Sequence, residues 1–105
     1  FKENEFNDTL NSLLIESSYE IQETSRNSKG QVQSYRSIIK VNLIINNKKE
    51  LVLKKNLLKD FSYANKDNKF ELIQYQNDIK NNLINKIIED IILFINVQWL
   101  LNILN

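Results

Sequence analysis

The stretch Tyr35–Ile45, which reads YRSIIKVNLII, decides the fold that this sequence predicts. Apolar and polar positions alternate along it with a period of two residues. One parity holds Tyr35, Ser37, Ile39, Val41, Leu43 and Ile45, and the other parity includes Arg36, Lys40 and Asn42. Such alternation over eleven residues, in a run rich in β-branched side chains, is typical of a strand with one buried face. We therefore predict a long strand here.

A second strand follows toward the C-terminus. The polar run 46–49, NNKK, predicts a turn, and beyond it Leu51, Leu53, Leu57, Phe61 and Tyr63 share one parity. The two runs therefore predict a hairpin with a four-residue loop. Lys55 and Lys59 interrupt the apolar parity of the second run. They indicate either that the far end of this strand twists out of the core, or that the strand lies at a sheet edge.

The C-terminal third predicts a helix. Residues 65–68, NKDN, form a polar turn in which Asp67 or Asn68 is placed to cap a helix. From Phe70 to Ile95 apolar residues recur at helical spacing, which predicts a helix of roughly 25 residues with one broad apolar face. The tail 97–105 contains the only tryptophan, Trp99. It either continues the helix onto the sheet or contacts a membrane or a partner.

The N-terminal third gives weaker signals. Phe6, Leu10, Leu13 and Leu14 fall on one helical stripe, so we predict a short helix within residues 5–16. Residues 18–25 predict a strand, and residues 26–30, which contain the only glycine, predict a loop. The expected fold is α+β: a small antiparallel or mixed sheet of three to four strands, with the short N-terminal helix and a long C-terminal helix packed on one face. No linker or repeat divides residues 1–105, so we expect a single domain.

Composition argues against catalysis. The 105 residues are 42% hydrophobic and 26% charged, which is too apolar for a disordered chain. They include no cysteine and no histidine, which removes thiolate chemistry, disulfides, the commonest general base and the commonest transition-metal ligand. A single glycine, Gly30, cannot build a phosphate-binding loop. We therefore expect a binding or assembly protein, not an enzyme, and expect neither a metal nor another cofactor.

Charge is unevenly distributed along the chain. The net charge is only +1, yet residues 36–60 hold seven Lys or Arg against two acidic residues. This basic island is either a contact for an anionic ligand or a solvated strand face whose lysines discourage aggregation. Binding to nucleic acid would require a larger basic excess and a stacking surface, so it is not expected.

Several runs of the chain resemble the LPS-assembly lipoprotein (LptE-like) family. They are residues 25–30 (SRNSKG), 35–41 (YRSIIKV) and 61–72 (FSYANKDNKFEL), then Tyr75, Asn82–Leu83 and 87–91 (IIEDI). The turn from FSYAN into the helix is the most telling of these runs. The resemblance covers about residues 20–96. It implies a small sheet with helices on one side, and it also implies that a lipidated cysteine and a first strand would precede Phe1.

The resemblance also implies a function. Members of that family are anchored to the periplasmic face of the outer membrane, plug and support the β-barrel translocon that inserts lipopolysaccharide, and can bind lipopolysaccharide. On this basis we expect Arg36, Lys40, Lys54, Lys55 and Lys59 to contact lipopolysaccharide phosphates, and Tyr63, Asn65 and Trp99 to contact the partner. The alternative expectation is a protein-interaction domain that uses its long helix and apolar C-terminal tail.

Overall fold

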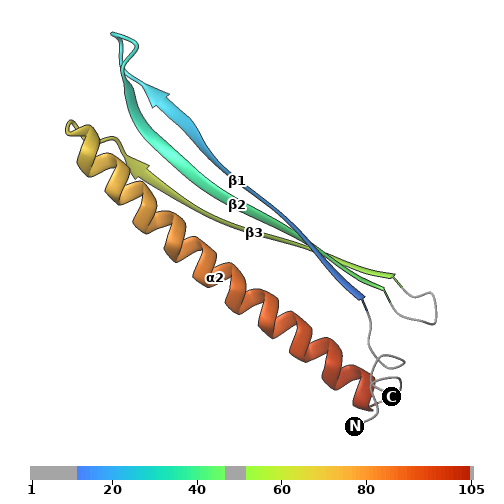
Figure 1. The fold of residues 1–105 in the computed structure, drawn as a ribbon. Coiled ribbons are helices and arrows are strands. Elements are labelled where there is room, and N and C mark those ends of the chain that lie inside the picture. The colour runs from blue at the N-terminus through green and yellow to red at the C-terminus, as the bar shows by residue number, and fades with distance from the viewer. Residues whose placement is uncertain (1–11, 47–51, 105) are drawn as a thin grey trace.

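A computed structural model describes residues 12–46 and 52–104 of the chain. These residues form three strands and one helix: β1 (Ser12–Arg26), β2 (Val32–Asn46), β3 (Val52–Ala64) and α2 (Lys69–Leu104). The strands form an open antiparallel sheet in the order β1-β2-β3, and α2 runs along one face of that sheet (Figure 1). The expected α+β class is thus confirmed, as is the long C-terminal helix on one face.

The central strand β2 is the stretch that the alternation predicted. Its odd-numbered residues point to the face that carries α2, here called the inner face, and its even-numbered residues point to the outer face. In the middle of the sheet Leu43 lies opposite Ile15 of β1 and Lys55 of β3, so all three share the inner face. Because β2 has a neighbour on each side, Val41 and Leu43 are almost fully buried.

The core lies between β2 and α2. Buried side chains from the strands meet a stripe of buried side chains from the helix, and the cluster comprises Ile39, Val41, Leu43, Tyr63, Ile79, Leu83 and Ile87. The helical members recur every four residues, which puts them on one side of α2. α2 contacts β2 and β3, whereas Tyr19 is the residue of β1 that packs against this cluster. The helix therefore covers two strands of the three.

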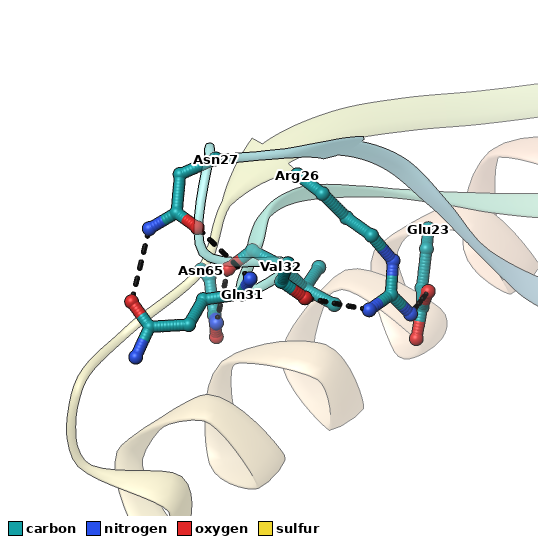
Figure 2. Close-up of polar contacts among 7 residues, drawn as sticks. Glu23, Arg26, Asn27, Gln31, Val32 and Asn65 are labelled. Atoms are coloured by element: carbon teal, nitrogen blue, oxygen red, sulfur yellow. Dashed lines mark hydrogen bonds and ion pairs between the residues drawn. The ribbon is translucent and has the colours of Figure 1, made fainter.

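Short polar contacts fix the connections between the elements. In the loop after β1, Asn27 Oδ1 accepts hydrogen bonds from the backbone N–H groups of Lys29 and Gln31, both at 2.9 Å. Gly30 has φ +79°, a conformation that a residue without Cβ adopts readily. Figure 2 shows this loop beside Asn65, whose amide donates to the carbonyl of Val32 at 2.8 Å. The loop predicted over residues 26–30 is therefore largely confirmed, with Arg26 still in β1.

The helix begins where the sequence predicted a cap. Asn68 Oδ1 accepts hydrogen bonds from the backbone N–H groups of Phe70 at 2.9 Å and Glu71 at 3.2 Å. These two donors have no partner within the first helical turn, so the side chain of Asn68 stabilises the helix start. α2 then runs for 36 residues, well beyond the predicted length, and passes through Val97 to Leu104.

The prediction of a short N-terminal helix is wrong for those of its residues that the structure describes. Ser12–Glu16 belong to β1, and the remainder of the predicted helix lies outside the described residues. Leu13, Leu14 and Ile15 are consecutive apolar residues, which satisfy a helical and a strand pattern equally well. Pairing with β2 decides between them, because it supplies a backbone hydrogen-bond ladder over the whole of this segment. Within the described residues the sheet has three strands and no fourth.

Candidate functional site

The predicted lipopolysaccharide-binding residues fall on two opposite faces of the sheet. Arg36, Lys40 and Lys54 have even numbers in β2 and β3 and lie on the outer face, whereas Lys55 and Lys59 lie on the inner face beneath α2. Strand alternation divides the basic island, since neighbouring residues of one strand point to opposite sides. The five residues therefore do not form one binding patch.

The two inner-face lysines reach residues of α2. Lys59 Nζ lies 3.1 Å from Asp90 Oδ2 of α2, and Lys55 Nζ lies 6.0 Å from the centre of the Phe94 ring. Both partners of the ion pair are more than a third exposed, so solvent screening limits its contribution to about 0–1 kcal/mol. Tyr63, near the far end of β3, is buried in the core, so this end does not twist out of the core. Among the described residues β3 is an edge strand, as the other interpretation expected.

On the outer face, one predicted residue is already engaged by the protein. Arg36 donates from Nε at 2.7 Å and lies within 2.6 Å through Nη2 of the same oxygen of Asp60. Lys40 and Lys54 are exposed on this face. The register sets them four positions apart along the strands, which is about 13 Å. Two lysines whose backbone positions are this far apart could contact two separated anionic groups of one ligand.

The three predicted partner-contact residues have different environments. The Tyr63 side chain is buried, and its hydroxyl bonds to Ser37 at 2.9 Å and accepts from Gln76 at 3.1 Å. Asn65 is exposed and ties the end of β3 to Val32. The Trp99 side chain lies outside the described residues, although its backbone continues α2. Tyr63 thus serves the core, and we do not assign it a partner contact below.

The sequence analysis missed an apolar surface on the inner face of β1. Leu13, Ile15 and Ile21 point to the side of the sheet that carries α2, yet each is more than two-fifths exposed because the helix does not extend over them. On α2, Ile73 and Ile88 are also exposed. The signal was present in the shared parity of Leu13, Ile15, Tyr19 and Ile21, but the helical spacing of Leu10, Leu13 and Leu14 concealed it.

A shallow pocket lies on the other side of the helix, beside β3. Its volume is about 260 Å³, and it is lined by Phe61 of β3 and by Tyr75, Asp78, Ile79, Asn82, Leu83 and Lys86 of α2. The lining combines an apolar floor with a carboxylate, an amide and an ammonium group. Among the described residues no cluster of acidic side chains could hold a metal ion. In the same part of the chain, no helix is long and apolar enough to cross a membrane.

Comparisons with known proteins identify no relative. No protein-family model matches the sequence, and no curated protein matches it.

Proposed function

We propose that this protein is a non-enzymatic accessory factor of lipopolysaccharide assembly, acting at the periplasmic face of the outer membrane in complex with a β-barrel translocon. The observation that carries the proposal is the run Phe61–Leu72, which resembles the LPS-assembly lipoprotein family and in which β3 ends, Asn68 caps and α2 begins. The proposal is supported by this resemblance and by the order of the strands and the helix along the chain. The membrane attachment, through a lipid anchor upstream of Phe1, belongs to the same proposal.

Within this proposal, the outer face of the sheet binds lipopolysaccharide. Lys40 and Lys54 are exposed there, and charge-assisted contacts between ammonium groups and phosphates are stronger than neutral hydrogen bonds. Arg36 supports them from its ion pair with Asp60. Lys55 and Lys59 are assigned a secondary role, because they already contact α2.

The assembly role is tested by recovery of a partner. The tagged protein is purified from outer membranes in mild detergent, and the proposal expects a large β-barrel protein in stoichiometric amount. Recovery of no barrel, with a protein that fractionates away from the envelope, would overturn the assembly role.

The ligand role is tested by charge reversal on one face. Lys40→Glu together with Lys54→Glu is expected to weaken binding of purified lipopolysaccharide by at least about tenfold, since two phosphate contacts become repulsions. Lys86→Glu on α2 is the matched control, because it changes the same charge on the other side of the sheet. Equal losses in the double variant and the control would show that the outer face is not the binding surface.

A second candidate is a general protein-interaction domain that binds through α2. The observation in its favour is the exposure of neighbouring large apolar residues on the helix: Ile88 at 44%, Ile92 at 54% and Leu93 at 63%, which lie within two turns of one another. Exposed apolar patches mark interaction surfaces when they are contiguous. A stoichiometric partner that is not a barrel, recovered in the same purification and lost with Leu93→Glu, would favour this candidate.

A further inference from the structure

The unpaired side of β1 is a long, regular strand edge. Within residues 12–46 and 52–104, β1 pairs with β2 on one side and with no strand on the other. Its pairing is regular from Ser12 to Glu23, and register shifts occur only between Glu23 and Arg26. Natural sheets usually protect such an edge with lysine, proline, a bulge or a covering element. β1 contains no lysine and no proline, and its irregularity is confined to one end.

An apolar surface lies beside this edge on the inner face, and we call it the trough: it comprises Leu13, Ile15, Tyr19 and Ile21 of β1 and Ile73 and Ile84 of α2. Its floor is Tyr19, over whose ring Lys80 Nζ of α2 lies at 5.0 Å from the centre. Ile73 and Ile84 lie within about 40° of Lys80 around the helix axis, so they share the flank of α2 that faces Tyr19 of β1. On the other side of Tyr19 lie the exposed apolar residues of the inner face of β1, which are Leu13, Ile15 and Ile21. Both walls of the trough are therefore apolar and partly exposed.

The hydroxyl of Tyr19 lies within this region and is shielded from solvent without a hydrogen-bond partner. A shielded hydroxyl that lacks a partner costs roughly 1–3 kcal/mol.

The outer side of the same strand is acidic. Glu16 and Glu20 point to the outer face, whereas Glu23 is engaged by Arg26 through an ion pair. Cross-strand neighbours of opposite charge stabilise a sheet, and like charges placed opposite one another destabilise it. An added strand is thus favoured if it carries Lys or Arg on its outer face.

The other sheet edge is protected. β3 carries Lys54, Lys55 and Lys59, which is the usual protection of an edge, and α2 packs over its inner face. Pairing of β1 with β1 of a second copy would bring two acidic strands together. The described chain therefore favours a different partner at β1 over a second copy.

We infer that the edge of β1 is a β-augmentation site for an extended segment of another protein. In that segment apolar side chains alternate with Lys or Arg. The apolar side chains fill the trough between β1 and α2, and the basic ones face Glu16 and Glu20. The backbone supplies the hydrogen bonds, and the alternation supplies specificity. This inference does not depend on the lipopolysaccharide proposal, because it uses the free edge of β1 and a different ligand.

The test uses a fluorescent peptide as long as Ser12–Gln22, in which valine alternates with lysine and threonine. Fluorescence anisotropy measures its binding to the whole protein, and hydrogen exchange locates the binding site. Binding is expected to slow amide exchange in β1 by at least about tenfold, since a new ladder protects those amides. A peptide with glutamate in place of lysine is expected to bind at least about tenfold more weakly.

Two neighbouring residues provide a matched pair of variants. Leu14 and Ile15 are 51% and 50% exposed, but Leu14 points outward and Ile15 points into the trough. Ile15→Gln is expected to weaken peptide binding by about tenfold or more, because an amide replaces an apolar side chain of the trough, whereas Leu14→Gln leaves binding within about threefold. Circular dichroism checks that both variants fold.

Three results would overturn the inference. They are equal binding by the two glutamine variants, protection in β3 and not in β1, and dimerisation of the protein through β1 at the concentrations used. None of these results bears on recovery of a barrel partner, so this test and that of the assembly role fail independently.

Discussion

The hydroxyl of Tyr63 connects three elements of the core. It bonds to Ser37 at 2.9 Å and accepts from Gln76 at 3.1 Å, so it links β2, β3 and α2. Its ring stacks on Tyr35 at a centroid distance of 5.8 Å and meets the edge of Tyr75 at 5.6 Å. Ser37 is completely buried, so its hydroxyl depends on this contact.

At the residue scale, Tyr63→Phe is expected to destabilise the protein by about 1–3 kcal/mol. The substitution keeps the aromatic contacts but removes one hydrogen-bond partner of buried Ser37. In the Tyr63→Phe protein, the further substitution Ser37→Ala should reduce stability much less than it does in the wild-type protein, because the partner hydroxyl is already absent. Urea unfolding of the four proteins gives this double-mutant cycle, and strictly additive losses would contradict it.

The roles of the basic side chains were harder to predict from the sequence than the helix cap and the glycine loop. The asparagine cap and the glycine loop follow from local chemistry, so the sequence located both correctly. The basic island was located as a segment, but its division depends on which parity of β3 faces the helix. Lys55 and Lys59 are charged residues at inner-face positions. Their aliphatic stems lie along α2, and their ammonium groups reach the surface of that helix. Sequence periodicity does not show such contacts.

At the element scale, α2 depends on its first turn and on one buried stripe. Asn68 satisfies two donors at the helix start, and Ile79, Leu83 and Ile87 bury the stripe against the sheet. A helix of 36 residues is about 54 Å long, so it follows the strands along most of their length. Packing on the sheet, more than intrinsic helix propensity, is expected to stabilise it.

Asn68→Ala is expected to destabilise the protein by about 1 kcal/mol, because the N–H groups of Phe70 and Glu71 lose their acceptor. Asn68→Asp retains an acceptor oxygen and adds a negative charge near the helix N-terminus, so its stability should stay close to wild type. Thermal unfolding followed by circular dichroism compares the two. A loss as large with aspartate as with alanine would show that the cap is not the cause.

The two faces of α2 can be compared with adjacent isoleucines. Ile87 is 2% exposed and Ile88 is 44% exposed. Ile87→Ala should cost about 2–5 kcal/mol through lost burial and a cavity, and Ile88→Ala no more than about 1 kcal/mol. Chemical unfolding measures both. Similar values for the two variants would mean that the helix packs through a different stripe.

At this scale the strongly periodic segments were the predictable ones. The alternation of Tyr35–Ile45 and the helical spacing after Phe70 each allow one structure, and both were correct in type. The segment from Leu13 to Ile15 allows two structures, and its choice of strand depends on a partner strand some thirty positions away in sequence. A local pattern cannot include that pairing, which explains the wrong helix.

On the scale of the whole molecule, the protein is elongated. Its extents are 64 × 25 × 20 Å, and its radius of gyration is 19.6 Å, whereas a compact chain of this length would have roughly 13 Å. The long strands and the single helix covering two of them cause this shape. Consequently much apolar surface stays exposed on β1 and on α2.

Small-angle X-ray scattering of dilute protein is expected to give a radius of gyration near 19.6 Å. The reason is that the long axis is set by strands of 13 to 15 residues and by the helix beside them. A dilution series separates the shape of the monomer from association. A value near that of a compact chain, roughly 13 Å, would contradict the elongated arrangement.

The path of the chain along this long axis also determines how the molecule responds to mechanical force. β1 begins beside Asn46, and α2 runs back from the end of β3 until Phe94 is level with Lys55, so Ser12 and Leu104 lie at the same end of the molecule (Figure 1). Tension between Ser12 and Leu104 loads the contacts between the elements in sequence, starting at the pulled end, and not simultaneously. Tension between Ser12 and the opposite end, at Asn27, shears the whole ladder between β1 and β2 instead. Single-molecule stretching should therefore find lower rupture forces for the first pair of attachment points than for the second.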